Sequence, residues 1–202
     1  MRISAKKVSE NPKILDDIVT SLREGGIICY PTDTVYGLGC DAFHAEAVER
    51  LYRIKQSERH KPMSVICMDI MDIHRQAVIP GYAYAILKMK LPGPYTFILP
   101  RKNPKLKILL REHPQAGIRM PDHPLCIQLT KKLGRPLVST SANISTEPTF
   151  STAEKIESAF PNQLSYIIDA GELNSPPSSV IDLTKDVPRV IREGKGGLTN
   201  FL

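Results

Sequence analysis

The chain has 202 residues, of which 42% are hydrophobic and 24% charged, and its formal net charge is +6. This composition is ordinary for a globular protein, and no apolar run approaches the roughly 18 residues of a membrane-spanning helix. The N-terminal segment MRISAKKVSENPK lacks an apolar core, which argues against a secretory signal. We therefore expect a cytoplasmic protein without a membrane partner, folded as a single domain over residues 1–202.

The first half of the chain alternates helix and strand patterns. Asn11 and Pro12 are typical of a helix start, and Gly25-Gly26 ends the apolar stripe that follows. A buried strand is expected at 27–30, then a loop rich in hydroxyl groups and a helix near 45–55. The apolar runs 63–68 and 95–100 predict two further strands.

The second half continues this alternation. Asp122 and Pro124 indicate a helix that reaches about Gly134, and a strand then runs into STSAN at 139–143. Ser151 and Glu154 have the spacing of a capping box, and YIID, SSVIDL and PRVIRE predict the last strands. The strands are apolar throughout, as in sheets covered on both faces. We expect an α/β fold (α+β in some schemes) of three layers, with helices flanking a twisted mixed sheet.

The cysteines are scattered, without a CxxC pair or matching histidine spacing. They are Cys29, Cys40, Cys67 and Cys126. This pattern argues against a zinc site or a disulfide framework and suits a reducing cytosol. We expect buried, unreactive thiols and no metal ligands.

A strongly basic segment occupies the middle of the chain, because no carboxylate lies between Asp72 and Glu112. Its charged residues are Arg75, Lys88, Lys90, Arg101, Lys102, Lys105, Lys107 and Arg111. Such a field attracts phosphate groups, so the segment Arg75–Arg111 is a candidate contact for nucleotide, RNA or tRNA. The alternative is a solvated basic face. The aromatic residues within it, Tyr82, Tyr84, Tyr95 and Phe97, are expected in the core.

Two clusters of hydroxyl groups follow predicted strands, at residues 32–36 and 139–143. Ligands of open sheets bind beyond the strand ends, so the clusters are candidates for one shared cleft. Alternatively, each is an ordinary turn, since threonine, aspartate, serine and asparagine favour turns. The glycines at 37 and 39 imitate a dinucleotide fingerprint, but six residues separate them from the strand, which argues against that function.

Several spaced motifs resemble the YrdC-like proteins, which include threonylcarbamoyl-adenylate synthases and the YciO branch. The similar segments are YPTDTVYGLGCDA, IKQSERHKPMSV, GIRMPDHPL, STSANIS, SSVIDLT and VIREG. They cover the chain from about residue 11 onwards. The segments PGPYTFILP and EGKGGLTNFL are most similar to the YciO branch.

The resemblance implies an enzyme that condenses L-threonine, bicarbonate and ATP, with Mg²⁺, into threonylcarbamoyl-adenylate and pyrophosphate for tRNA modification. Matching motif positions imply a threonine site formed by Thr32, Thr34, Arg119, Ser141 and Ser178. They imply an ATP site formed by Lys55, Arg59, Ser139, Asn143, Ser151 and Arg192, with Lys55 and Arg59 as the catalytic pair.

Three of the charged residues among them also have a plain structural interpretation. Lys55 resembles a solvated lysine at a helix end, and Arg119 resembles one member of a surface ion pair at a strand end. Arg192 would pair with Asp182 or in the neighbourhood of Glu193. Ser151 would serve as a helix N-cap, which is also a phosphate site.

The chain departs from the synthases at two positions: Ser57 replaces the arginine of a Lys-x-Arg pair, and Ile66 replaces a histidine expected in the substrate pocket. Three functions therefore stay open. The first is the synthase, the second a YciO-like protein that hydrolyses the adenylate or acts on modified tRNA, and the third a non-catalytic module that binds tRNA or double-stranded RNA.

Overall fold

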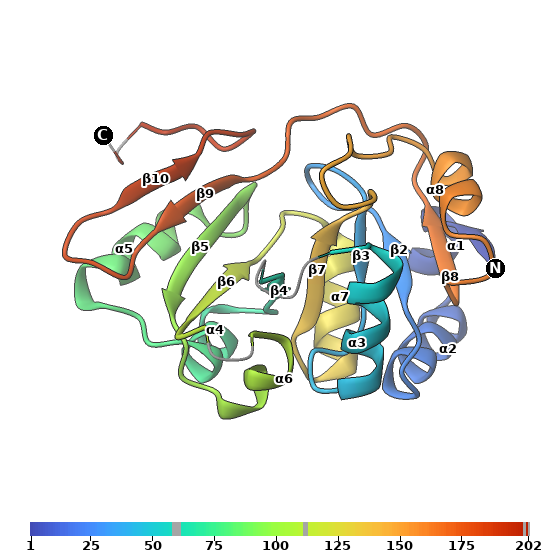
Figure 1. The fold of residues 1–202 in the computed structure, drawn as a ribbon, viewed down its shortest axis with the longest axis horizontal. Coiled ribbons are helices and arrows are strands. Elements are labelled where there is room, and N and C mark those ends of the chain that lie inside the picture. The colour runs from blue at the N-terminus through green and yellow to red at the C-terminus, as the bar shows by residue number, and fades with distance from the viewer. Residues whose placement is uncertain (58–61, 111–112, 200, 202) are drawn as a thin grey trace.

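The structure is a computed structural model that describes residues 1–57, 62–110, 113–199 and 201 (Figure 1). Its helices are α1 (Ala5–Glu10), α2 (Pro12–Arg23), α3 (Ala45–Ile54), α4 (Ile70–Gln76), α5 (Gly81–Lys90), η1 (Pro104–Leu106), α6 (Lys107–Leu110), α7 (Pro124–Leu133) and α8 (Ala153–Ala159). Its strands are β1 (Arg2–Ser4), β2 (Ile28–Tyr30), β3 (Gly37–Gly39), β4 (Ser64–Ile66), β5 (Tyr95–Pro100), β6 (Gln115–Arg119), β7 (Leu137–Ser141), β8 (Tyr166–Asp169), β9 (Ser179–Asp182) and β10 (Arg189–Arg192). Within these ranges, every helix is too short or too polar to cross a lipid bilayer.

The ten described strands form one mixed sheet, in the order β1-β8-β2-β3-β7-β4-β6-β5-β9-β10. The central strands β3, β7 and β4 pair antiparallel, whereas β4 with β6 and β5 with β9 are parallel. The connection 170–178 crosses from β8, near one edge of the sheet, to β9, near the other (Figure 1). Late residues of the chain are thus brought beside the middle of the sheet.

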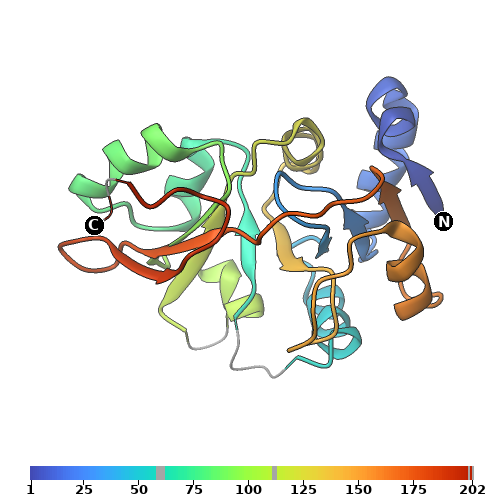
Figure 2. The ribbon, with the colours of Figure 1, turned by 90° about the horizontal axis from the view of Figure 1, so that it is seen from above.

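Helices cover both faces of this sheet, which confirms the expected three layers. Figure 2 shows α2, α5 and α7 on one side and α3, α6 and α8 on the other. One hydrophobic cluster joins α1, α2 and α7 to the sheet, and a larger one joins α3, α5, α6 and α8 to it. The central strands β2 and β3 are buried at every residue, as expected for strands with helices on both faces, whereas the edge strands β1 and β10 are largely exposed.

The helix α2 begins as expected, because the Asn11 side chain accepts a hydrogen bond from the Lys13 N–H at 3.0 Å. The cap of α8 is different: Thr152, rather than Ser151, is the N-cap, and its hydroxyl accepts from the Lys155 N–H at 3.4 Å. The capping-box prediction was therefore wrong by one residue. Several elements were not predicted, namely β1, β3, α1, α4, α5, η1 and α6, and of β6 only its end at Arg119 was expected.

All four cysteines are buried free thiols, as expected. Burial raises the pKa of the Cys126 thiol to about 12 and that of Cys67 well above its ordinary value. Tyr95 and Phe97 are core residues, but Tyr84 is 50% exposed, so its predicted place in the core was wrong.

Candidate active site

A cavity of about 400 Å³ lies over the middle of the sheet. Six of the residues singled out from the sequence line it: Thr34, Arg119, Ser139, Ser141, Ser178 and Arg192. They come from the β2–β3 loop, β6, β7, the start of β9 and β10. The two hydroxyl clusters therefore do face one cleft, and among the described lining residues none is acidic.

The pairing of β3 with β7 brings the two clusters together, since Gly37 lies opposite Ser141 in the antiparallel register. The ring of Tyr30 packs across β3, and its hydroxyl donates to the Val138 carbonyl at 3.1 Å. A Cβ on Gly39 would lie 2.2 Å from that carbonyl oxygen. Glycine is required here so that the β3 backbone can approach β7 and the tyrosine ring.

Thr32 shapes the loop rather than the cavity wall. Its buried hydroxyl accepts from the Thr34 N–H at 3.1 Å and donates to the Val35 carbonyl at 2.7 Å. It also lies 2.9 Å from the Thr34 hydroxyl. This tight turn points the Thr34 side chain into the cavity, so Thr32 acts on the site through its neighbour.

Arg119 ends β6 with only 7% of the residue exposed, so it is not part of a surface ion pair. Its guanidinium donates to the Thr34 hydroxyl at 3.2 Å and to the Ser139 hydroxyl at 3.3 Å. Its Nη2 lies 3.6 Å from Oδ1 of Asp33. Its buried Nε has no hydrogen-bond partner among the described residues.

Arg192 lies on β10 and donates from Nη2 to the Ser178 carbonyl at 2.8 Å. The Ser178 hydroxyl lies 2.8 Å from that of Thr96, so Ser178 links β9 and β5 to this arginine. Burial lowers the pKa of Arg192, and the positive charge of the nearby Arg119 lowers it further. Arg192 forms no ion pair with a described residue, so the alternative of a contact with Asp182 is not found. The fields of two guanidinium groups overlap in the cavity, which favours an anionic ligand.

Lys55 is the C-cap of α3 and lies behind the wall of the cavity, 4% exposed, rather than in solvent. Its Nζ donates to the Ser141 carbonyl at 2.6 Å, and to the carbonyl and Oδ1 of Asn143 at 2.8 and 3.0 Å. Burial lowers the pKa of Lys55 to about 8. The lysine therefore fixes the turn that follows β7, with three oxygen atoms around its ammonium group.

Ser151 is not part of the cavity wall. Ser151 borders a second hollow, which shares Val35, Thr149 and Pro177 with the first. Arg59 lies outside the described residues. Ile66 is buried in the core cluster of α2 and α7 and does not line the cavity. The replacement of the synthases' histidine by Ile66 was expected to alter the pocket wall, but at this position it affects core packing instead.

Sequence reasoning missed several residues of the site. Thr96, Ser64 and Gln115 line the cavity, and Asp33 lies behind Arg119. On β6, residues 115, 117 and 119 all face the cavity, as strand alternation from Arg119 would have predicted. The contact of Asp33 with Arg119 joins distant parts of the chain and leaves no local signal.

The basic segment lies elsewhere, since none of its described charged side chains lines the cavity. Lys90 lies over the Phe201 ring, 5.2 Å from its centroid, and Arg75 pairs with Asp72 at 3.3 Å. Lys102 donates to the His74 carbonyl at 3.2 Å. Arg111 lies outside the described residues.

These features define a three-layer α/β protein with a cationic, hydroxyl-lined cavity over its sheet. The profile of the Sua5/YciO/YrdC family, described as "Telomere recombination", matches residues 20–194, and the chain belongs to this family.

Among its relatives, YciO of Escherichia coli (strain K12) is 36% identical over 197 residues, 96% of each chain. The crystal structure of E. coli YciO has a TM-score of 0.87 at 34% identity and covers 95% of this chain and 94% of that one. The threonylcarbamoyl-AMP synthase of Bos taurus is 35% identical over 180 residues, 89% of this chain and 64% of its own. P. abyssi Sua5 complexed with L-threonine has a TM-score of 0.86 at 31% identity, over 91% of this chain and 55% of that one.

Proposed function

We propose that this protein is an L-threonylcarbamoyladenylate synthase, which converts L-threonine, bicarbonate and ATP into threonylcarbamoyl-AMP and pyrophosphate for tRNA modification in the cytoplasm. The observation that carries the proposal is the cavity in which Arg119 and Arg192 face hydroxyl groups without an acidic side chain in the described lining. Similarity to a threonylcarbamoyl-AMP synthase and to a Sua5 complexed with L-threonine supports it.

The chemistry requires positioning and charge stabilisation rather than a covalent enzyme intermediate. The threonine amine takes up bicarbonate as a carbamate and loses water, and a carbamate oxygen then attacks the α-phosphorus of ATP. The bond to pyrophosphate breaks as the new P–O bond forms. Two bound reactants held in line, with cations beside the developing charge, supply most of the acceleration in such transfers.

We assign the threonine carboxylate to Arg119, because a guanidinium pairs with a carboxylate through two parallel hydrogen bonds. The hydroxyls of Thr34, Ser141 and Ser178 would surround the rest of the amino acid. Arg192 would face the nucleotide phosphates. Ser139 lies beside Arg119 and supports its guanidinium.

We assign supporting roles to the remaining described residues of the ATP site. Lys55 and Asn143 hold the turn after β7, and Ser151 lies at the neighbouring hollow. Arg59 keeps its assignment to ATP and catalysis from the family motif alone. We propose that all these residues act within one domain.

The described residues hold no cluster of three histidine, cysteine, aspartate or glutamate side chains that would suit a resident metal. We therefore regard Mg²⁺ as part of the nucleotide substrate. Contact with tRNA through the segment Arg75–Arg111 would be separate from the cavity, which none of its described charges lines.

Mass detection of threonylcarbamoyl-AMP tests the proposal. Product should form only when threonine, bicarbonate, ATP and Mg²⁺ are all present. Arg192→Gln should reduce its formation by about a hundredfold, as expected for loss of a charged contact to the transition state. Arg189→Gln is the matched control, because Arg189 lies on the same strand but does not line the cavity.

Product formation by Arg192→Gln at the rate of the control would refute the site. Absence of product with the wild-type protein, together with hydrolysis of added threonylcarbamoyl-AMP, would instead indicate the YciO-like alternative.

A further inference from the structure

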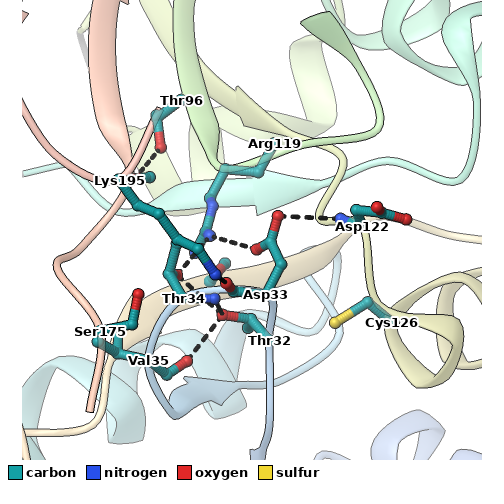
Figure 3. Close-up of polar contacts among 12 residues, drawn as sticks. Thr32, Asp33, Thr34, Val35, Thr96, Arg119, Asp122, Cys126, Ser175 and Lys195 are labelled. Atoms are coloured by element: carbon teal, nitrogen blue, oxygen red, sulfur yellow. Dashed lines mark hydrogen bonds and ion pairs between the residues drawn. The ribbon is translucent and has the colours of Figure 1, made fainter. Parts of the chain in front are cut away.

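A carboxylate lies against the arginine of the cavity, on the side away from the ligand space. Asp33 and Arg119 have side chains that are each 8% exposed, and Oδ1 of the aspartate lies 3.6 Å from Nη2 of the arginine. Figure 3 shows the two groups facing one another, with the side chain of Lys195 passing beside them. Oδ1 is buried and has no hydrogen-bond partner among the described residues.

One hydrogen bond holds this carboxylate, and two further contacts hold the backbone around it. Its Oδ2 accepts a hydrogen bond from the Asp122 N–H, at the loop before α7, at 3.0 Å. The backbone carbonyl of Asp33 accepts from Nζ of Lys195, and the next residue, Thr34, is bonded to Arg119. These contacts favour the orientation in which the carboxylate faces the arginine.

We propose that Asp33 is a specificity-determining residue, which makes the Arg119 end of the cavity select an amino-acid zwitterion over a plain carboxylate or inorganic anion. The inference rests on the function proposed above. Asp33 is a positioning residue rather than a catalytic one, because its buried Oδ1 acts on a ligand through charge and through the orientation of Arg119.

The physical reason is the balance of charge near the arginine. A plain anion bound to Arg119 is attracted by the guanidinium but repelled by the carboxylate behind it. An amino acid also carries an ammonium group, two bonds from its carboxylate. Asp33 repels the carboxylate of the amino acid and attracts its ammonium group, so the two effects largely cancel. A unit charge within about 1 nm in such a site changes the affinity of a monoanion by about tenfold.

This selection has a use in the proposed reaction. Bicarbonate is a substrate and other small anions are abundant, and two cavity arginines alone would attract all of them. A fixed negative charge behind Arg119 lowers the occupancy of that position by simple anions and leaves it to the amino acid.

Isothermal titration calorimetry with two ligands tests the proposal: L-threonine, and 3-hydroxybutyrate of the same configuration at the hydroxyl-bearing carbon, which is threonine without its amino group. The wild-type protein should prefer threonine. In Asp33→Asn, which keeps an oxygen for the Asp122 N–H, this preference should fall by about tenfold, mainly through tighter binding of 3-hydroxybutyrate.

Two further variants separate charge from structure. Asp33→Glu keeps the charge and should restore the preference for threonine. Asp186→Asn changes the net charge of the protein equally, in the turn between β9 and β10 and outside the cavity lining, and should behave as wild type.

An unchanged ratio in Asp33→Asn, with threonine binding preserved, would overturn the role of Asp33 and leave the proposed function intact. Equal loss of both ligands would show a merely structural role and overturn it as well. Absence of threonine binding by the wild-type protein would overturn both proposals.

Discussion

The buried ammonium group of Lys55 predicts a distinctive dependence of stability on pH. Its pKa is lowered by burial from 10.5 to about 8. Between about pH 8 and pH 10.5, Lys55 is protonated in the unfolded chain but neutral in the folded protein. The free energy of unfolding therefore rises with pH over this range. The difference corresponds to roughly 3 kcal/mol, all of it gained between about pH 8 and pH 10.5.

The perturbation is Lys55→Met, which keeps the length of the side chain but cannot titrate. At pH 7 the variant loses three hydrogen bonds to the turn after β7 but also removes the cost of burying a charge. The net destabilisation should be about 2 kcal/mol. At pH 10 the gap between wild type and variant should be wider by about 2–3 kcal/mol, because the wild type has by then gained stability.

Urea denaturation at several pH values measures both quantities, since the effects of other titrating groups cancel in the difference between the two proteins. Lys88→Met on α5 is the control, because this lysine is exposed and loses no buried charge. A gap between wild type and Lys55→Met that stays constant from pH 7 to pH 10 would refute the reasoning.

Two further changes test the framework of the cavity. Gly39→Ala places a Cβ 2.2 Å from the Val138 carbonyl oxygen. It should lower the free energy of unfolding, measured by denaturation, by about 3 kcal/mol. An unchanged denaturation midpoint would contradict the close approach of β3 to β7. Tyr36→Phe removes a hydroxyl that donates to the Gly171 carbonyl and accepts from the Ala170 N–H, each at 2.8 Å. It should cost about 2 kcal/mol and free the segment after β8, and amide hydrogen exchange unchanged at 170–171 would argue against that attachment.

The sequence predicted the elements whose signals are local. The cap at Asn11, the apolar run of β5 and the strand before Ser139 all follow from residues within a few positions of one another. The strand β3 has no such signal, because Gly-Leu-Gly has low strand propensity and is held by the Tyr30 ring and by β7.

Site residues divide in the same way. Family motifs led to Thr34 and Arg192, which do share the cavity. Whether Lys55 is solvated or buried depends on where the turn after β7 lies, and the role of Asp33 depends on Arg119, 86 positions away in the sequence. Long-range contacts of this kind leave no periodic pattern in the chain.

The crossing from β8 to β9 has a consequence for synthesis of the protein. Arg192 is synthesised long after Thr34. The ribosome must therefore translate the whole span between them before the binding site is complete. Until then the growing polypeptide carries β5 without its parallel neighbour and exposes an unpaired edge, a state in which chaperones or slow translation would protect it from aggregation.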